Sequence, residues 1–467
     1  MKIYDRLYKE MKFPAIIMEL LNCPGLLRLR DVRMANNQFV AFPAFATASR
    51  YEHSLGVCYL AGICADKLGL DEKSRIELMM ACLYHDVGTP PFAHAMEEVL
   101  QAKFGFDHEK NLKDLILGTT GVFDGELAQV YQGQSLKLRS VCQNSQARRL
   151  GIDLERIAMM AVGDPAELFS GLVNSRGMDL DNIDNIFRAS SAMGIIQGEY
   201  GEMAKMLAGA FRIQDGEICL DGLYWNQIRE WQHVRDIQYA AIFESEDDFA
   251  YQTMVKEAIN LLFEEDENVK LDKQSWRMTD SEITNNVLLK HRKSRAIMQR
   301  VLLCQPYTCL GILYLKGDNS ASYVNSHLRE IEQTVSKYFV EFMGISKKRL
   351  QAIGTSPVVA NFYLDKRKRA VLNKIISVKE ETINKSAFMS GTLLGFFTPL
   401  SNENYKNVEE GGIRRRKRVS FGRFQMEEVR GLLKKGLLKE FEVTFYGGEG
   451  ENEKTDTNAR ADQLGLF

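Results

Sequence analysis

Apolar residues recur at helical spacing along most of the first 345 positions of the chain. From His53 they lie three or four positions apart as far as Leu68, and Gly69 is a residue type that commonly ends helices. Asp71 is typical of an N-cap, and a second apolar stripe follows it as far as Tyr84. The pattern therefore predicts two consecutive helices joined by a short turn.

The later pattern is also mainly helical. Pro90 and Pro91 force a turn, and a short third helix is predicted from Phe92 to about Phe104. A short strand is predicted at Ile312–Leu315. Helical periodicity returns at 153–162, 179–193, 197–211, 222–244, 248–264, 281–302 and about 322–342. We therefore predict a mainly α fold.

The composition changes after about residue 345, where apolar runs become short and typical of strands. Such runs occupy Ser356–Tyr363 and Glu440–Tyr446, and basic clusters occupy Lys366–Arg369 and Arg414–Arg418. We predict three parts: a helical core at 1–345, a smaller C-terminal α+β appendage at 346–447 and a disordered polar tail at 448–467.

The composition and net charge of the chain exclude only a few classes of protein. The 467 residues are 45% apolar and carry a formal net charge of −2, so bulk charge gives no case for a general nucleic-acid binder. No run approaches the roughly 20 apolar residues of a membrane span, and the charged start lacks the apolar region of a signal peptide. The eight cysteines form no CxxC pair, which favours reduced thiols. We expect a cytoplasmic protein without membrane contact.

Histidine is rare, with seven in the chain, and four of them lie between residues 53 and 108. Imidazole nitrogens and carboxylate oxygens together bind divalent ions that keep a position open for water. His85 and Asp86 can supply two ligands from the end of one helix, and His53 can supply a third from the start of the preceding helix. An isolated His-Asp pair is more often a surface pair or a satisfied core histidine, so the surrounding sequence is needed to interpret it.

Three motifs surround these residues: Arg50–Val57 (RYEHSLGV), Tyr84–His94 (YHDVGTPPFAH) and Gly177–Asp184 (GMDLDNID). Their order and spacing resemble those of the HD-domain deoxynucleoside triphosphate triphosphohydrolases, and Arg28–Arg30 also fits that family. The resemblance covers roughly residues 24–260, about half of the chain. It implies that the helical core is an HD-domain bundle.

The resemblance also implies roles for individual residues. The positions that match the four metal ligands of the family are His53, His85, Asp86 and Asp181. The other matching positions are a catalytic histidine beside the scissile phosphate (His94), its acidic partner (Glu97), a further active-site histidine (His108) and a phosphate-contacting arginine (Arg50). His94 and Glu97 are three positions apart, so their side chains can face the same side of a helix.

Each of these residues also has an interpretation without catalysis. Arg50 could form an ordinary salt bridge, His94 could close the turn after the prolines, Glu97 could lie on a solvated helix face, and His108 could be a loop histidine. In the third motif Asp179 is typical of an N-cap, which makes Asp181 the predicted ligand and Asp184 the weaker competitor.

Five positions depart from the family and bear on the substrate. Thr89 stands where many members have a histidine. Four and eight residues after Asp181, where a tyrosine and an aspartate are common, the chain has Asn185 and Ala189. A Gln-Leu pair that holds the nucleoside in some members is replaced by Met34-Ala35. The metal site therefore matches the family better than the nucleotide pocket does.

The leading hypothesis is metal-dependent hydrolysis of deoxynucleoside triphosphates to deoxynucleoside and tripolyphosphate. One alternative is an HD phosphohydrolase that acts on a nucleoside monophosphate or on a cyclic or signalling nucleotide. Another is a non-catalytic scaffold that binds nucleotides or nucleic acid. Two histidines with two aspartates admit Fe, Mn, Zn, Ni or Mg.

The family often forms tetramers or hexamers that nucleotides regulate, so a regulatory nucleotide and a homo-oligomer are expected. The basic run Arg414–Arg418 is either a solvated loop or an anion site for a regulatory nucleotide or a nucleic-acid strand.

Overall fold

The computed structural model describes residues 2–35, 41–123, 145–175, 177–243, 245–263, 271–365, 374–377, 391–410 and 412–446, with the single residues 129, 136 and 138. The predicted tail at 448–467 and the basic cluster at 366–369 lie outside these ranges. The chain divides into two compact units: 1–239, 255–304 and 370–387 form the first, and 240–254, 305–369 and 388–467 form the second.

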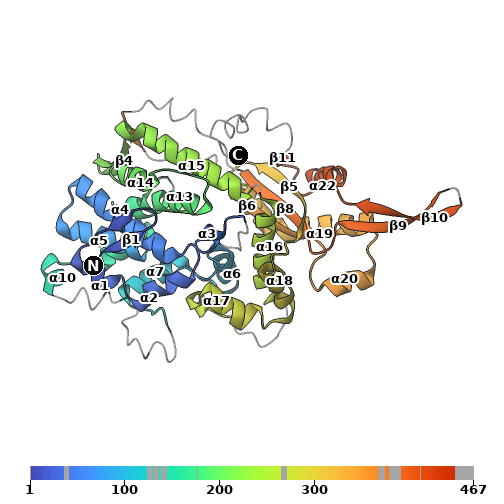
Figure 1. Cartoon of the computed structure of the whole chain (residues 1–467), viewed down its shortest axis with the longest axis horizontal. Helices are drawn as coiled ribbons and strands as arrows, with labels where there is room; N and C mark the ends of the chain where they lie inside the picture. The colour runs from blue at the N-terminus through green and yellow to red at the C-terminus, as the bar shows by residue number, and fades with distance from the viewer. Residues whose placement is uncertain are drawn as a thin grey trace. The chain divides into compact units, whose positions relative to one another are not determined.

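The first unit is built mainly of helices, in agreement with the predicted fold class (Figure 1). Up to residue 208 its helices are α1 (Ala15–Leu20), α2 (Pro24–Leu27), α3 (Pro43–Ala46), α4 (Arg50–Leu68), α5 (Glu72–Tyr84), α6 (His94–Phe104), α7 (His108–Leu117), α10 (Ser145–Leu150), α11 (Leu154–Val162), α12 (Ser170–Val173), α13 (Leu180–Met193) and α14 (Tyr200–Ala208). The helices α15 (Trp225–Phe243) and α16 (Glu246–Leu261) each have residues in both units, and α17 (Asp280–Ile283) and α18 (Arg292–Leu302) belong to the first. Short 3-10 helices lie at Arg28–Asp31, Gly222–Tyr224 and Lys273–Arg277.

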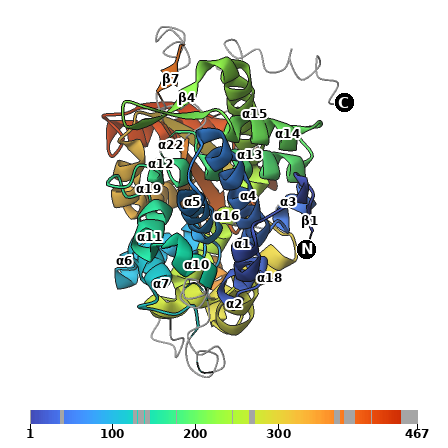
Figure 2. The ribbon, with the colours of Figure 1, turned by 90° about the vertical axis from the view of Figure 1, so that its left-hand side faces the viewer.

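The pair α4 and α5 forms the centre of this unit, and the two helices lie side by side in Figure 2. The helix α4 ends at Gly69, which adopts the left-handed conformation at φ +66°, and α5 begins after Asp71, whose carboxylate accepts a hydrogen bond from the Ser74 backbone. Both predicted signals are therefore confirmed. The helices α11 and α13 pack against α5 and α4 respectively, which fixes the ends that carry the candidate ligands.

Two small sheets complete the first unit. The strands β1 (Ile3–Asp5) and β2 (Lys9–Met11) pair antiparallel, and β3 (Phe211–Gln214) and β4 (Glu217–Asp221) pair antiparallel with β7 (Ile375–Ile376) beside β4 in parallel. The helix predicted at 197–211 is therefore shorter than expected, because the chain enters β3 at Phe211. Among the described helices, none combines the length and apolar character needed to cross a bilayer.

The predicted helix at 281–302 is not continuous. Its first part is α17 followed by a π-helical turn at Thr284–Leu288, and α18 begins only at Arg292. The break has a local cause, because the side chain of His291 accepts a hydrogen bond from the Ser294 backbone and so caps a new helix.

The second unit is an α+β structure. Its sheet has the strand order β11 (Glu442–Phe445), β5 (Thr308–Lys316), β8 (Gly391–Thr398) and β6 (Val359–Asp365), and every pairing is antiparallel (Figure 1). The helix α19 (Ser320–Met343) packs on β6 and β8, and α22 (Arg423–Lys435) packs on β5. A buried apolar core joins these elements, including Leu313, Phe339 and Leu394.

Further elements that lie wholly in this unit are α20 (Lys347–Ile353) and a two-stranded ribbon of β9 (Glu403–Glu410) and β10 (Ile413–Ser420). The unit takes in β5 and α19, which the sequence interpretation placed with the helical core at 1–345. The physical reason is that β5 lies between β8 and β11, strands that come about 80 and 130 residues later in the chain.

Candidate metal centre

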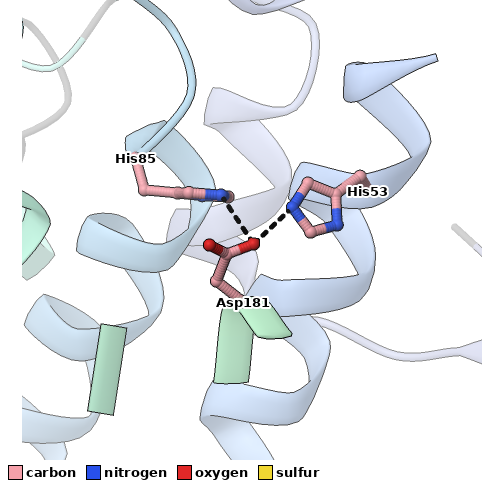
Figure 3. Close-up of side chains that lie close together, drawn as sticks. All are labelled: His53, His85 and Asp181. Carbon is pink, nitrogen blue, oxygen red and sulfur yellow. Dashed lines mark hydrogen bonds and ion pairs between the residues drawn. The ribbon is translucent and has the colours of Figure 1, made fainter. Parts of the chain in front are cut away.

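Three helices of the first unit bring the candidate ligands together (Figure 3). His53 lies in the first turn of α4, which Ser49 caps. His85 is the C-cap residue of α5, and Asp86 follows it. Asp181 lies in the first turn of α13, where Asp179 is the N-cap and accepts a hydrogen bond from the Asn182 backbone. The interpretation of Asp179 as a cap agrees with the structure.

Asp181 lies between the two imidazole rings. Its Oδ1 atom is 2.8 Å from Nε2 of His53 and 3.7 Å from Nε2 of His85. One ligand atom from each residue lies within 4.8 Å of the others, so one ion could contact all three. Both histidines are buried, whereas the Asp181 side chain is 31% exposed, so the cluster is open on the side of Asp181.

Asp86 lies beside this group. Its Oδ2 atom is 3.7 Å from Nε2 of His85 and 3.9 Å from Nε2 of His53. Both carboxylate oxygens also accept hydrogen bonds from Nη1 of Arg50, at 2.9 and 2.7 Å, and Oδ1 accepts one from the Thr89 hydroxyl at 2.9 Å. The structure thus brings all four predicted ligands together and places Arg50 directly behind one of them.

Hydrogen bonds on the far side of each ring direct both Nε2 atoms toward the cluster. Nδ1 of His53 lies 2.7 Å from Oδ1 of Asp184, and Nδ1 of His85 lies 2.8 Å from the Cys82 carbonyl oxygen. Both partners are acceptors, so each Nδ1 donates and each Nε2 can present its lone pair to a cation. Nε2 of His85 is buried and has no hydrogen-bond partner within the described part of the chain. An orphaned imidazole nitrogen among carboxylates fits a divalent metal.

Asp184, the weaker competitor for a ligand in the sequence, is instead a buried support for His53. Its carboxylate also accepts hydrogen bonds from Arg188, at 2.8 and 3.0 Å, and from the Tyr8 hydroxyl at 2.8 Å. Arg188 in turn donates to Asp5 at 2.8 Å. The resemblance did not point to this network. The only sequence signal for it is the four-residue spacing of Asp184 and Arg188.

Gly56 makes this network possible. A Cβ atom at position 56 would lie 2.0 Å from Oδ2 of Asp184 and 2.5 Å from Nη2 of Arg188. The absence of a side chain therefore lets α13 bring its carboxylate against α4.

The negatively charged carboxylates of the cluster raise the pKa of His53. Burial opposes the charged ring, but the hydrogen bonds to Asp181 and Asp184 outweigh burial and raise the pKa of His53 to about 10. A divalent cation at the same place would gain from the same carboxylates and would compete with that proton.

Glu97 connects the two remaining candidate histidines. Its Oε2 atom accepts a hydrogen bond from Nδ1 of His94 at 3.2 Å, and its Oε1 atom lies 4.0 Å from Nδ1 of His108. The His94 side chain is 81% exposed, whereas His108 is largely covered, and burial lowers the pKa of His108. The predicted pairing of His94 with Glu97 is present, and His108 lies on the other side of the same carboxylate.

A strained turn leads into α6 and places His94. Phe92 and Ala93 have φ angles of +54° and +46°, which L-residues rarely adopt. The Asp280 carboxylate accepts hydrogen bonds from the Phe92 backbone at 2.9 Å and from the Arg33 backbone at 3.1 Å. Asp280 therefore fixes the residue two positions before His94, a role that the sequence did not suggest.

Arg28 fixes the start of the same loop. This buried guanidinium donates to the carbonyl oxygens of Val87 and Thr89 at 3.2 and 2.7 Å, and to that of Met278 at 2.9 Å. The loop after Asp86 is therefore tied to the segment that precedes α17. The motif around Arg28 matched the family, but its structural role was not predicted.

The positions that depart from the family lie close to the cluster or in the core. Thr89 is buried and donates its hydroxyl to Asp86, so it supplies no acid. Ala189 is completely buried on α13, and Ala35 is buried as well.

Comparison with known proteins identifies the domain that carries His53, His85 and Asp86 but ends before Asp181. Residues 50–129 match the HD domain family. The Deoxynucleoside triphosphate triphosphohydrolase SAMHD1 homolog of Dictyostelium discoideum is 34% identical over 117 residues, which cover 23% of this chain and 23% of that protein. Deoxynucleoside triphosphate triphosphohydrolase SAMHD1 of Danio rerio is 21% identical over 352 residues, which cover 67% of this chain and 56% of that protein. The chain thus spans less than two thirds of the length of either relative.

A solved structure shares the fold. The crystal structure of a hypothetical protein from Aquifex aeolicus superposes with a TM-score of 0.60 at 16% sequence identity, covering 85% of this chain and 96% of that chain. The similarity therefore extends over both units of the chain, although it carries no information about the reaction.

Proposed function

Since the chain carries an HD domain and resembles the HD-domain deoxynucleoside triphosphate triphosphohydrolases, we propose that it is a metal-dependent hydrolase of deoxynucleoside triphosphates. The products would be a deoxynucleoside and tripolyphosphate. The observation that supports this most strongly is the convergence of His53, His85 and Asp181, with Asp86 beside them, at a site that is open to solvent through Asp181.

A divalent ion held by these four residues would supply a Lewis acid that polarises a phosphoryl oxygen and lowers the pKa of a water molecule. Arg50 would bind the substrate directly. Its Nη1 atom holds Asp86, and the 15% of its side-chain surface that stays exposed can offer an N–H group to a phosphate oxygen. The guanidinium would thereby orient the phosphate chain against the cluster.

His94 is the proposed source of the proton for the leaving group. Hydrolysis adds water at the α-phosphorus and breaks its bond to the 5′ oxygen, which must gain a proton. Glu97 accepts the hydrogen bond from Nδ1 of His94, so Nε2 is the ring atom left for the substrate, and it can donate a proton from the imidazolium form that the Glu97 carboxylate stabilises. His108, with its lowered pKa, would help to hold Glu97 in place.

A product assay tests this proposal. The protein is incubated with Mn²⁺ or Mg²⁺ and each deoxynucleoside triphosphate, singly and mixed, and the products are separated by anion-exchange chromatography. The proposal requires equal amounts of deoxynucleoside and tripolyphosphate. Release of only monophosphate or pyrophosphate would contradict it, and a metal-loaded protein without turnover would favour a binding scaffold.

The departures from the family support a second candidate, another HD phosphohydrolase. Thr89 provides no histidine, and Asn185 and Ala189 replace residues near the sugar and phosphates in family members. In this candidate the same metal site acts on a nucleoside monophosphate or on a cyclic or signalling nucleotide. Faster turnover of such a nucleotide in the same assay would favour this candidate.

Regulation and assembly remain part of the proposal. We expect a homo-oligomer, a tetramer or hexamer, whose activity responds to a bound regulatory nucleotide. Sedimentation with and without added nucleotide tests both expectations.

A further inference from the structure

The ribbon of β9 and β10 is an unusual part of the second unit because most of its described side chains are exposed. Figure 1 shows it extending away from α19 and α22 of the same unit. The basic run Arg414–Arg418 lies entirely on β10, and all five of its residues are exposed. An isolated two-stranded ribbon buries little apolar surface and so gains little stability from its side chains. Its basic composition therefore calls for an explanation other than folding.

The strand register sorts these side chains onto two faces. Arg416 lies opposite Asn407 and Arg418 lies opposite Tyr405, and residues that are directly paired point to the same side. The guanidinium of Arg416 lies 6.0 Å from the ring of Tyr405, as expected for diagonal neighbours on one face. We call this face, formed by Glu403, Tyr405, Asn407, Glu409, Arg414, Arg416 and Arg418, the open ribbon face.

The opposite face is partly covered by the end of α19. Asn404 donates a hydrogen bond to the Met343 carbonyl oxygen, and the Lys406 ammonium donates to that of Phe342 and lies 5.2 Å from its ring. These contacts anchor the ribbon to its unit. They leave the open ribbon face directed to solvent, where the Tyr405 side chain remains 58% exposed.

Charge on the open ribbon face is positive at its centre. Glu403 forms an ion pair with Arg418, and Glu409 lies opposite Arg414 in the register, but Arg416 lies opposite the neutral Asn407. Charged residues on exposed strands can also serve to prevent aggregation. One or two lysines would be enough to prevent aggregation. Protection against aggregation therefore does not explain why arginines occupy alternate positions beside an exposed aromatic ring.

We propose that the open ribbon face binds single-stranded nucleic acid. Arginines at alternate positions along a strand form a row of phosphate contacts about 6.6 Å apart, and an exposed tyrosine between them offers a ring on which a base can stack. The planar guanidinium suits phosphate oxygens better than an ammonium does. This inference is independent of the proposed function, because none of these residues belongs to the metal centre.

The test measures binding of a fluorescein-labelled 20-nucleotide oligothymidylate to the full chain by fluorescence anisotropy. Three arginine contacts predict that the logarithm of affinity falls with the logarithm of salt concentration with a slope of about −2. Affinity should therefore drop roughly 20-fold between 50 and 200 mM salt. The triple change Arg414→Gln, Arg416→Gln and Arg418→Gln should abolish most of this slope, and Tyr405→Ala should weaken binding about tenfold.

A matched control removes equal charge elsewhere in the same unit. Lys347, Lys348 and Arg349 are exposed on α20, and their replacement by Gln should leave binding unchanged. Circular dichroism and thermal melting of all variants check folding. Equal loss in the control variant would overturn the proposal. So would tighter binding of the corresponding duplex, or binding only to vesicles that contain phosphatidylserine.

Discussion

Nδ1 of His53 lies 2.7 Å from Oδ1 of Asp184, a carboxylate that is completely buried. Because a carboxylate only accepts hydrogen bonds, Nδ1 holds its proton there and Nε2 is directed toward Asp181. Asp184 is itself held by Arg188 and Tyr8. The orientation of a candidate metal ligand thus depends on a network that begins in the first strand of the chain, at Asp5.

We predict that Asp184→Asn lowers metal affinity about 10–100-fold, because the buried partner of His53 loses its charge. The change also leaves Arg188 with less compensation, so the free energy of unfolding should fall by about 3 kcal/mol. Metal titration and chemical denaturation measure the two effects. Asp66→Asn is the control, since it removes an exposed ion pair with Arg75 and should cost less than about 1 kcal/mol. Unchanged metal affinity in Asp184→Asn would contradict the support role.

Gly56 offers a test of the close approach between α4 and α13. Gly56→Ala should destabilise the protein by about 1–3 kcal/mol and weaken metal binding, because the new methyl group displaces Asp184 and Arg188. Gly62→Ala, on the same helix, places its methyl group 3.3 Å from the flexible end of Met79 and should change stability by less than about 1 kcal/mol. Thermal denaturation compares the two variants. Equal effects would show that helix propensity, and not the approach, decides the result.

His94→Ala should reduce turnover about 100- to 10,000-fold while leaving the metal content unchanged, because it removes only the proposed proton donor. The side chain is exposed, so little stability should be lost. Rates are measured at saturating substrate, and bound metal by mass spectrometry. His233→Ala, at an exposed position of α15, serves as the control and should retain full activity. Loss of metal in His94→Ala would move this residue into the ligand set.

Asp280 should act on turnover through the strained turn that it holds. Asp280→Asn replaces one accepting oxygen by a donor, so either Phe92 or Arg33 loses its partner. We expect at least a tenfold lower turnover with metal content retained. Asp272→Asn, which makes the same change at an exposed helix cap in the same segment, should keep its activity. Equal losses in both variants would point to a general effect on folding.

The sequence predicted the local elements around the site well, because their signals are local. Gly69 and Asp71 marked the junction of α4 and α5, and the spacing of His53, His85 and Asp181 within recognisable motifs indicated the cluster. The structure brings these residues together, while their roles in catalysis remain predictions.

Long-range features could not be derived in the same way. The pairing of β5 with β8 joins segments about 80 residues apart, and no local pattern specifies it. Likewise, nothing near Asp280 indicates that its carboxylate meets the Phe92 backbone. The sequence identified Asp184 as a possible metal ligand. Whether this residue binds an ion or supports His53 depends on which side of α13 faces α4, and the sequence does not show that.

The proposed chemistry requires that His53, His85, Asp86 and Asp181 hold one divalent ion. It is tested most directly by the metal content of the purified protein and of the double variant His85→Ala, Asp86→Ala, measured by inductively coupled plasma mass spectrometry after equilibration with Mn²⁺. The parent protein should hold one ion per chain, and a folded double variant should hold almost none and lose turnover as well. A full complement of metal in the double variant would contradict it.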